Sequence, residues 1–486
     1  MADRPVTTIP GPAQVPAIPA RLEPDAIGAA QDTVIGMANA APTVSIGLSL
    51  APLAAVAAYA VGPVILLTAV PMIIIANAYR RLNLWNANCG ASFEWVGRAI
   101  NPYLGFITGW LMITGTLVGG ISGVVVLAPS VLAIFGASAT STWPNILIST
   151  AVILIMLTIA VVGIRITART QVSMAAVEYL ILIGFAVTGF IVVLGHHHGT
   201  FPITSSWFNI SGIGGKGSLA SGFLIAVFMY TGWDATVYVN EEVKHRRHNP
   251  GRAAVLAVAL LAVIYTVCSM GLAGVVSPAK LQANASDTLV YLAQVMGGGG
   301  WAKVMALSLA LSVIGSTGTA VVVIARMAYG MASHRVLPPA LGLVHRRFST
   351  PVVASVTVGL ILIAATWVYL LSTSVATVFS DVIDITGLLY CGFYVLTAIS
   401  AMVYYRRRVF GNVWDGILVG ILPVAASGFL VWIVVKSLQT APWSQRWSVI
   451  GIVAAGLIMM FVARFGLRSP FFTIARETAT RERVGV

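Results

Sequence analysis

Charged residues are scarce in this chain. Asp, Glu, Lys and Arg together make up 9% of its 486 residues, whereas soluble domains carry about 25%. Hydrophobic residues make up 58%, and apolar stretches long enough to cross a bilayer recur along most of the sequence. This composition excludes an ordinary soluble domain and indicates an all-α integral membrane protein.

Cysteine is scarce as well. The chain has three cysteines, Cys89, Cys268 and Cys391, which are isolated from one another and lack metal-ligand spacing. We expect them to be small packing residues. The sequence shows no nucleotide-binding loop, no nucleophile motif and no metal-ligand cluster, so we expect neither an enzyme nor a cofactor or metal. The N-terminal residues lack the pattern of a cleaved signal peptide.

The apolar stretches predict twelve transmembrane helices. The predicted spans are 29–51, 54–78, 104–133, 145–164, 172–195, 218–241, 252–276, 301–329, 352–371, 377–405, 415–438 and 446–466. With the N-terminus inside, all but five of the 28 Lys and Arg fall on the cytoplasmic side. The five outside are Lys216, Lys280, Lys303, Lys436 and Arg446. Because basic residues concentrate in cytoplasmic loops, the net charge of +13 reflects orientation and predicts no nucleic-acid partner.

Two of the predicted spans are interrupted. The first contains Asn39, Ala40, Ala41 and Pro42, and the sixth contains the polar stretch 230–235 with the sequence Tyr-Thr-Gly-Trp-Asp-Ala. At membrane depth, non-helical backbone is tolerated only where protein or a wet cavity covers it. Interrupted helices at matching positions of two halves are typical of secondary transporters. Pro42 suits the first position of a new helix.

The spacing of the two breaks predicts the organisation of the chain. They lie five spans apart, and because five is odd the second set of five spans is inverted relative to the first. We therefore predict a disordered cytoplasmic tail (1–26), a first repeat (27–195), an inverted second repeat (218–408), two extra C-terminal spans (413–466) and a cytoplasmic tail (467–486). Both termini are expected in the cytoplasm, and the location is the plasma (inner) membrane. The loop 88–101 is either an interfacial helix or a solvated connector.

The motifs around the breaks resemble those of the amino acid–polyamine–organocation superfamily. The stretch 228–234 reads Phe-Met-Tyr-Thr-Gly-Trp-Asp and is followed by Glu-Glu-Val-Lys at 241–244 and Asn-Pro-Gly-Arg-Ala at 249–253. The stretch 101–110 is similar to the family's entry to span three. The resemblance covers nearly the whole chain after residue 26 and implies an amino acid permease-like transporter. Where the family usually has Gly-Ser/Ala-Gly in span one, this chain has Ala40, Ala41 and Pro42.

The two breaks predict a binding site for a zwitterion. The start of the half-helix at Pro42 carries partial positive charge and favours a carboxylate. Carbonyls freed at the break in span six accept hydrogen bonds from an ammonium group. The resemblance implies the same arrangement, with Phe228 as an aromatic lid. The predicted substrate-binding residues are Asn39, Ala40, Ala41, Thr43, Phe228, Met229, Tyr230 and Gly232.

Two intramembrane acids are candidates for coupling, because such residues are costly and usually functional. Asp234 follows the second break and either exchanges a proton, as the matching residue is thought to do in related exchangers, or caps the next half-helix. Glu178 lies in span five, near the place where some proton-coupled relatives carry a lysine. It holds a proton, binds a cation, pairs with a basic group or makes a structural hydrogen bond.

Other polar residues allow further interpretations. Ser312, Ser316, Thr317 and Thr319 of span eight are sodium-ligand candidates or interhelical hydrogen-bonding groups. Asp381 and Asp384 form an outer gate or cap a helix start. The run His196–His198 binds a metal or is solvated, and Asp32 is expected to pair with an arginine of an inner gate.

The sequence as a whole predicts a secondary active transporter of amino acids or related amines that works by alternating access. Its partners are a small-molecule substrate, protons or alternatively sodium, and the lipid bilayer. Proton-coupled symport is the favoured mode, and exchange and sodium-coupled symport are alternatives. A passive channel and a sensor derived from a transporter fold are the rivals from other classes. The substrate's identity and the oligomeric state do not follow from the sequence.

Overall fold

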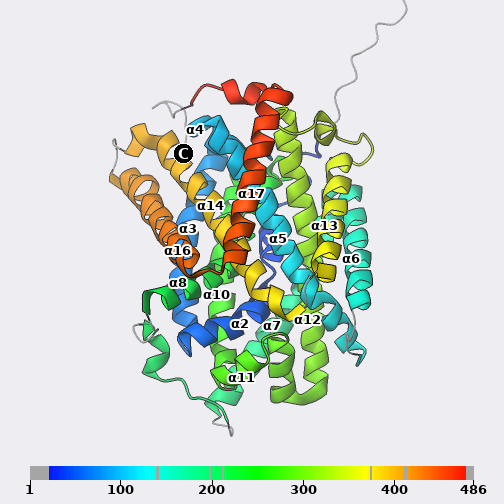
Figure 1. Ribbon diagram of the computed structural model, residues 1–486, viewed down its shortest axis with the longest axis vertical. Coiled ribbons are helices and arrows are strands. Elements are labelled where there is room, and N and C mark those ends of the chain that lie inside the picture. The colour runs from blue at the N-terminus through cyan, green and yellow to red at the C-terminus, as the bar shows by residue number, and fades with distance from the viewer. Residues whose placement is uncertain are drawn as a thin grey trace, which may run out of the picture.

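The protein is a bundle of long helices that run roughly side by side along its longest axis (Figure 1). The computed structural model describes residues 21–477 apart from 138–141, 196–198, 211, 212, 214, 373, 374, 410 and 412. Within these residues the β-type pairing is limited to one bridge, between Ile27 and Val243. The predicted all-α fold is confirmed. Most of the predicted N-terminal tail, 1–20, lies outside the described residues.

The described residues contain eleven helical segments that are long and apolar enough to cross a membrane. The α-helices are α1 (Ala29–Asn39), α2 (Pro42–Ala57), α3 (Val61–Trp85), α4 (Ala91–Ala99), α5 (Pro102–Ile134), α6 (Thr142–Val162), α7 (Ile164–Leu194), α8 (Gly215–Met229), α9 (Ala235–Tyr238), α10 (Asn249–Ala273), α11 (Pro278–Ala283), α12 (Thr288–Ser333), α13 (Val352–Ser372), α14 (Val375–Val409), α15 (Val413–Asp415), α16 (Leu422–Thr440) and α17 (Trp443–Phe461). The helices α1 and α2 together form one of the eleven segments. The apolar part of α8, Leu219–Met229, is too short to be counted. The twelve-span count and the inverted repeat stay predictions.

One predicted boundary is wrong. The second span starts at Val61 and not at residue 54, because α2 continues to Ala57. The residues between α2 and α3 are Ala58, Tyr59 and Ala60, so no charge in the sequence marks the turn. The predicted start of the eighth span, residue 301, lies close to a break within α12, where the non-helical Gly298 separates two helices.

The first break lies between α1 and α2. Ala41 adopts a left-handed backbone conformation, with φ 46° and ψ 67°, and Pro42 is the first residue of α2, as predicted. An L-residue in this conformation costs about 1–2 kcal/mol, which a glycine avoids. The sharp bend is therefore formed without glycine, at the expense of backbone strain.

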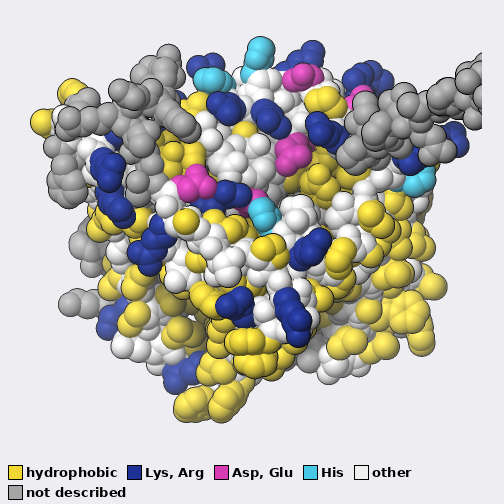
Figure 2. Space-filling model, turned by 90° about the horizontal axis from the view of Figure 1, so that it is seen from above, with side chains coloured by type: hydrophobic (Ala, Val, Ile, Leu, Met, Phe, Trp, Pro, Cys, Tyr) yellow, Lys and Arg dark blue, Asp and Glu magenta, His cyan; other side chains and the backbone are white. Residues whose placement is uncertain are grey.

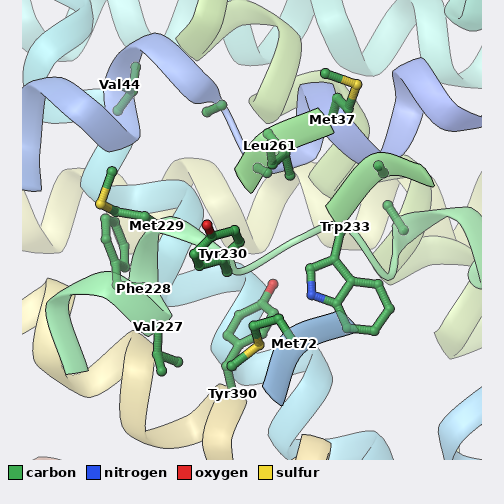
Figure 3. Close-up of a cluster of buried hydrophobic side chains, with 14 of the residues drawn as sticks. Met37, Val44, Met72, Val227, Phe228, Met229, Tyr230, Trp233, Leu261 and Tyr390 are labelled. Carbon is green, nitrogen blue, oxygen red and sulfur yellow. The ribbon is translucent and has the colours of Figure 1, made fainter. Parts of the chain in front are cut away.

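The second break separates α8 from α9 and touches the first. Figure 3 shows Tyr230 and Trp233 on the non-helical segment that joins the two helices. Gly232 in this segment has a φ of 100°, and the carbonyl carbon of Asn39 lies 2.9 Å from where a Cβ on Gly232 would be. The Asn39 side-chain amide donates a hydrogen bond to the Gly232 carbonyl at 3.1 Å. The two interruptions thus support each other directly.

The loop 88–101 contains a helix, α4, so the interpretation as a solvated connector is wrong. The side chains of Phe93, Trp95 and Val96 are fully buried. Arg98 pairs with Glu94 at 2.6 Å and with Glu477 of the C-terminal segment at 2.8 Å.

The carboxylate of Glu94 is charged at neutral pH. Burial raises its pKa, but the hydrogen bond and charge of His334 and the charge of Arg98 outweigh burial and lower the pKa below its ordinary value. The C-terminal segment also packs on α4 through Phe471, whose ring stacks on Phe93 with centroids 4.2 Å apart. Ion pairs and aromatic stacking together hold this segment across α4.

Lys and Arg side chains gather on the face of the molecule where α4 lies. Figure 2 looks onto this face, which carries more basic than acidic side chains. We call it the basic end. It is the end that the sequence places in the cytoplasm, and the opposite end carries α11 (Figure 1).

The contact between the breaks predicts the effect of a methyl group at Gly232. In Gly232→Ala the new Cβ meets the backbone of Asn39, and alanine is strained at a φ of 100°. We expect the free energy of unfolding to fall by about 1–3 kcal/mol, measured by thermal unfolding of the purified protein. Gly428→Ala in α16 is the matched control, because no atom lies within 4 Å of its Cβ position. Equal stability of the two variants would contradict the proposed packing.

Candidate functional site

The two breaks meet at a small internal cavity of about 40 Å³. That volume has room for roughly three water molecules. The lining residues come from both breaks and from α5, α12 and α14: Asn39, Ala40, Ala41, Val44, Ser45, Thr116, Gly119, Gly120, Ser122, Gly123, Phe228, Thr231, Ser316, Ala320 and Tyr390. The non-helical backbone therefore borders a cavity, as its depth in the bundle requires.

Four of the eight predicted substrate-binding residues line this cavity: Asn39, Ala40, Ala41 and Phe228. The sequence analysis missed the contribution of α5, which supplies the small residues Gly119, Gly120 and Gly123. A cluster of glycines in an otherwise bulky span was the available signal. It also missed Tyr390 of α14, whose hydroxyl shares a hydrogen bond with that of Thr116 at 3.1 Å.

The other predicted residues lie behind the cavity wall. Met229 and Tyr230 are fully buried, and the Tyr230 hydroxyl donates to the carbonyl of Ile65 at 3.2 Å. The carbonyl of Phe228, which we expected to be free, accepts from both the N–H and the hydroxyl of Thr231, at 3.0 and 2.8 Å. Thus this carbonyl is occupied in the present conformation.

The start of α2 binds a carboxylate that belongs to the protein itself. Pro42 has no N–H, and the next two N–H groups are both paired. That of Thr43 donates to Oε1 of Glu178 at 3.1 Å, and that of Val44 donates to the Ser312 hydroxyl at 3.4 Å. Glu178 is 3% exposed. A negative group at a helix N-terminus is favourable, so Glu178 occupies the position predicted for a substrate carboxylate.

Glu178 makes the structural hydrogen bond that was one of its expected roles. The Thr43 hydroxyl, next to it, shares a hydrogen bond with the Ser308 hydroxyl at 3.0 Å. In the part of the chain that the structure describes, Glu178 pairs with no Lys or Arg. The proton and cation roles stay predictions.

Asp234 lies directly after the second break and is 2% exposed. Its carboxylate makes no capping hydrogen bond to α9, so the interpretation as a helix cap is wrong. Instead it accepts a hydrogen bond from the Tyr394 hydroxyl of α14 at 3.0 Å. The ring of Trp233 stacks on Tyr394 with centroids 5.2 Å apart. The break is therefore fastened to α14, and the proton role of Asp234 stays a prediction.

For Asp384 the expected role as a helix cap is wrong, and its role in an outer gate stays a prediction. Asp384 lies well inside α14, which begins at Val375, and therefore does not cap it; it accepts from the side-chain amide of Gln445 at 3.0 Å. Asp32 is fully buried, and among the described residues neither of its oxygens has a hydrogen-bond partner. Its predicted pairing with an arginine is wrong. The side chain of Asp381 and the run His196–His198 lie outside the described residues.

The hydroxyls of α12 serve mainly as hydrogen-bonding groups. Ser316 lines the cavity and donates to a carbonyl of its own helix at 3.1 Å. Thr319 also donates to a carbonyl of its own helix, while Ser312 accepts from α2. Thr317 is buried and does not line the cavity. Among the described residues, no three His, Cys, Asp or Glu side chains are grouped to hold a metal ion.

Comparison with known proteins identifies the family of the chain. The family profile described as amino acid permease matches residues 32–463. The mouse Asc-type amino acid transporter 1 is 24% identical over 292 residues, which are 57% of this chain and 52% of the mouse protein. The human protein of that name is 30% identical over 138 residues, 28% of this chain and 26% of the human one.

The mouse large neutral amino acids transporter small subunit 2 is 28% identical over 138 residues, 28% of this chain and 26% of the relative. The chain thus matches at most about half the length of these relatives. The family match confirms the predicted superfamily and the expectation that the protein is not an enzyme. This multi-pass membrane protein belongs to the amino acid permease family.

Proposed function

We propose that this protein moves an amino acid or a related amine across the membrane by alternating access, with the cavity between the two breaks as its substrate site. The observation that carries the proposal is that both breaks line one cavity. Transporters bind their substrates near the bilayer midplane, at discontinuous helices. The names of the relatives support amino acids as the substrate class.

The cavity suits a small polar solute. Hydroxyl groups of Thr116, Ser122, Thr231 and Tyr390 and the amide of Asn39 surround it. Its volume of about 40 Å³ is too small for most amino acids, so binding requires the walls to move apart. Alternating access requires such a change between a closed and an opened cavity.

Glu178 supports proton coupling. Its carboxylate holds the N–H of Thr43, next to Val44 of the cavity lining, and a substrate carboxylate would use that N–H once the walls have moved apart. Two carboxylates compete for one helix start, and protonation of Glu178 would weaken its hold there. Binding of a proton and of a substrate carboxylate would then favour each other, which is the requirement for symport. Exchange and sodium-coupled symport are the alternatives.

Uptake of labelled amino acids and amines into proteoliposomes tests the function. Each solute is offered with an inward proton gradient, with a sodium gradient, with neither, and with unlabelled solute preloaded inside. Accumulation driven by protons supports the symporter, and uptake only into preloaded vesicles supports an exchanger. Uptake that does not saturate would favour a channel. No uptake of any solute would contradict the transport proposal.

The variant Glu178→Gln tests the coupling role. Glutamine keeps the size of glutamate and still accepts the Thr43 N–H, but it does not take up a proton. We expect proton-driven accumulation to fall about tenfold or more, while uptake into preloaded vesicles stays within a few-fold of wild type. Glu23→Gln, which removes the charge of an exposed residue paired with Arg165, is the control. Full proton-driven accumulation by Glu178→Gln would rule out the coupling role.

A further inference from the structure

An open groove lies between α3 and α10 at the basic end. It has a volume of about 440 Å³ and is lined by Asn77, Arg80, Arg252, Val255, Leu256 and Ala259. None of these residues lines the cavity between the two breaks. Small-molecule sites in proteins have volumes of about 300–1,000 Å³, so the groove is large enough to be a separate binding site.

A glycine brings the two arginines of the groove together. Arg80 lies near the end of α3, and Arg252 lies in the first turn of α10, directly after Gly251. A Cβ on Gly251 would lie 2.6 Å from the Cα of Arg80, so a glycine is needed for the two helices to approach this closely. As a result, the guanidinium groups of Arg80 and Arg252 are near enough to repel each other.

These two guanidinium groups differ from others in the protein because they lack an acidic partner. Three other arginines have one: Arg81 pairs with Asp415 at 3.0 Å, Arg98 with Glu94 at 2.6 Å and Arg326 with Glu242 at 2.9 Å. Among the described residues, no Asp or Glu forms an ion pair with Arg80 or Arg252. Arg80 donates instead from Nε to the side-chain oxygen of Asn77 at 3.1 Å. Two neighbouring positive charges without an acid favour the binding of an anion.

The rest of the groove is apolar and belongs to one face of α10. Its four lining residues on this helix are spaced three and four apart, so they lie on the same side. This side continues away from the basic end as a row of apolar side chains that are 40–61% exposed: Leu256, Leu260, Val263 and Val267. Because α10 is one of the segments able to cross a membrane, this row borders the acyl chains of the bilayer.

We propose that the groove binds one phospholipid with an anionic headgroup, with its phosphate on Arg80 and Arg252 and the start of an acyl chain along Val255 and Leu256. Long arginine side chains near helix ends reach the headgroup level, and a guanidinium group binds phosphate through paired hydrogen bonds. Basic pockets between transmembrane helices on the cytoplasmic side bind anionic headgroups. A soluble phosphate compound would use the arginines but leave the apolar part uncovered, so the groove favours a lipid.

Photolabelling of the purified protein in phosphatidylcholine vesicles tests the site. The probe is a trace of phosphatidylglycerol that carries a diazirine near the start of one acyl chain, and mass spectrometry of the digested protein locates the label. We expect labelled peptides from the ends of α3 and α10 at the basic end. A phosphatidylcholine probe with the same diazirine should label them about tenfold less, and excess unlabelled phosphatidylglycerol should compete.

Matched variants test the contribution of charge. In Arg80→Gln with Arg252→Gln, we expect labelling of α10 by the phosphatidylglycerol probe to fall about tenfold or more. The control, Arg169→Gln with Arg346→Gln, removes the same charge from exposed positions outside the groove. Its labelling should stay within about threefold of wild type, because these arginines do not touch the lipid. Thermal unfolding shows whether each variant is folded.

A second pair of variants tests shape at unchanged charge. Ala259→Phe places a ring in the apolar part of the groove and should lower the labelling of α10 about tenfold or more. Val368→Phe adds the same ring to α13, at a position that is 67% exposed, and should have no effect. The pair keeps the inference testable even if the arginine variants do not fold.

Equal labelling of α10 by the two probes would mean ordinary contact with bulk lipid and would overturn the inference. Equal labelling in a groove variant and its folded control would overturn it as well. Soluble glycerophosphoglycerol is the last arm, because it has the headgroup without acyl chains. We expect it not to compete at the concentration at which phosphatidylglycerol does. If it competes equally well, the groove is a site for a soluble phosphate compound and the assignment to a lipid is wrong.

Discussion

Every backbone polar group inside a bilayer needs a hydrogen-bond partner from the protein, and the architecture around the two breaks follows from that constraint. The breaks free N–H and carbonyl groups in the middle of the bundle. Glu178 and Ser312 satisfy the N–H groups at the start of α2, and Asn39 satisfies the Gly232 carbonyl. The Ala40 carbonyl accepts from the hydroxyls of Ser45 and Tyr265.

These partners come from helices that lie far apart in the sequence. Glu178 belongs to α7, Ser312 to α12 and Tyr265 to α10. Of the side chains that satisfy the breaks, Asn39 and Ser45 also line the cavity, whose lining combines polar and apolar residues. A substrate or a proton that changes one hydrogen bond there acts on the geometry of both breaks.

The sequence predicted the breaks because their chemistry is local. Pro42 lacks an N–H, and Gly232 lies in a polar stretch within an apolar span, and both features are visible without a structure. The left-handed Ala41 was not predictable, because alanine carries no signal for it. The α5 side of the cavity and the pairing of Glu242 with Arg326 depend on which helix faces which. Almost uniformly apolar helices give little periodicity from which to infer their orientation.

The central claim is that the cavity between the breaks binds the substrate, and filling that cavity tests it most directly. Gly120 lines the cavity, and a Cβ there would make only an ordinary contact of 3.6 Å with Leu362. We would measure binding of a transported, labelled amino acid or amine to the purified protein and to Gly120→Val, with thermal unfolding as the check on folding. The account predicts saturable binding by the wild type and about tenfold or greater loss of affinity in the folded variant. Equal affinity in the two proteins would contradict it.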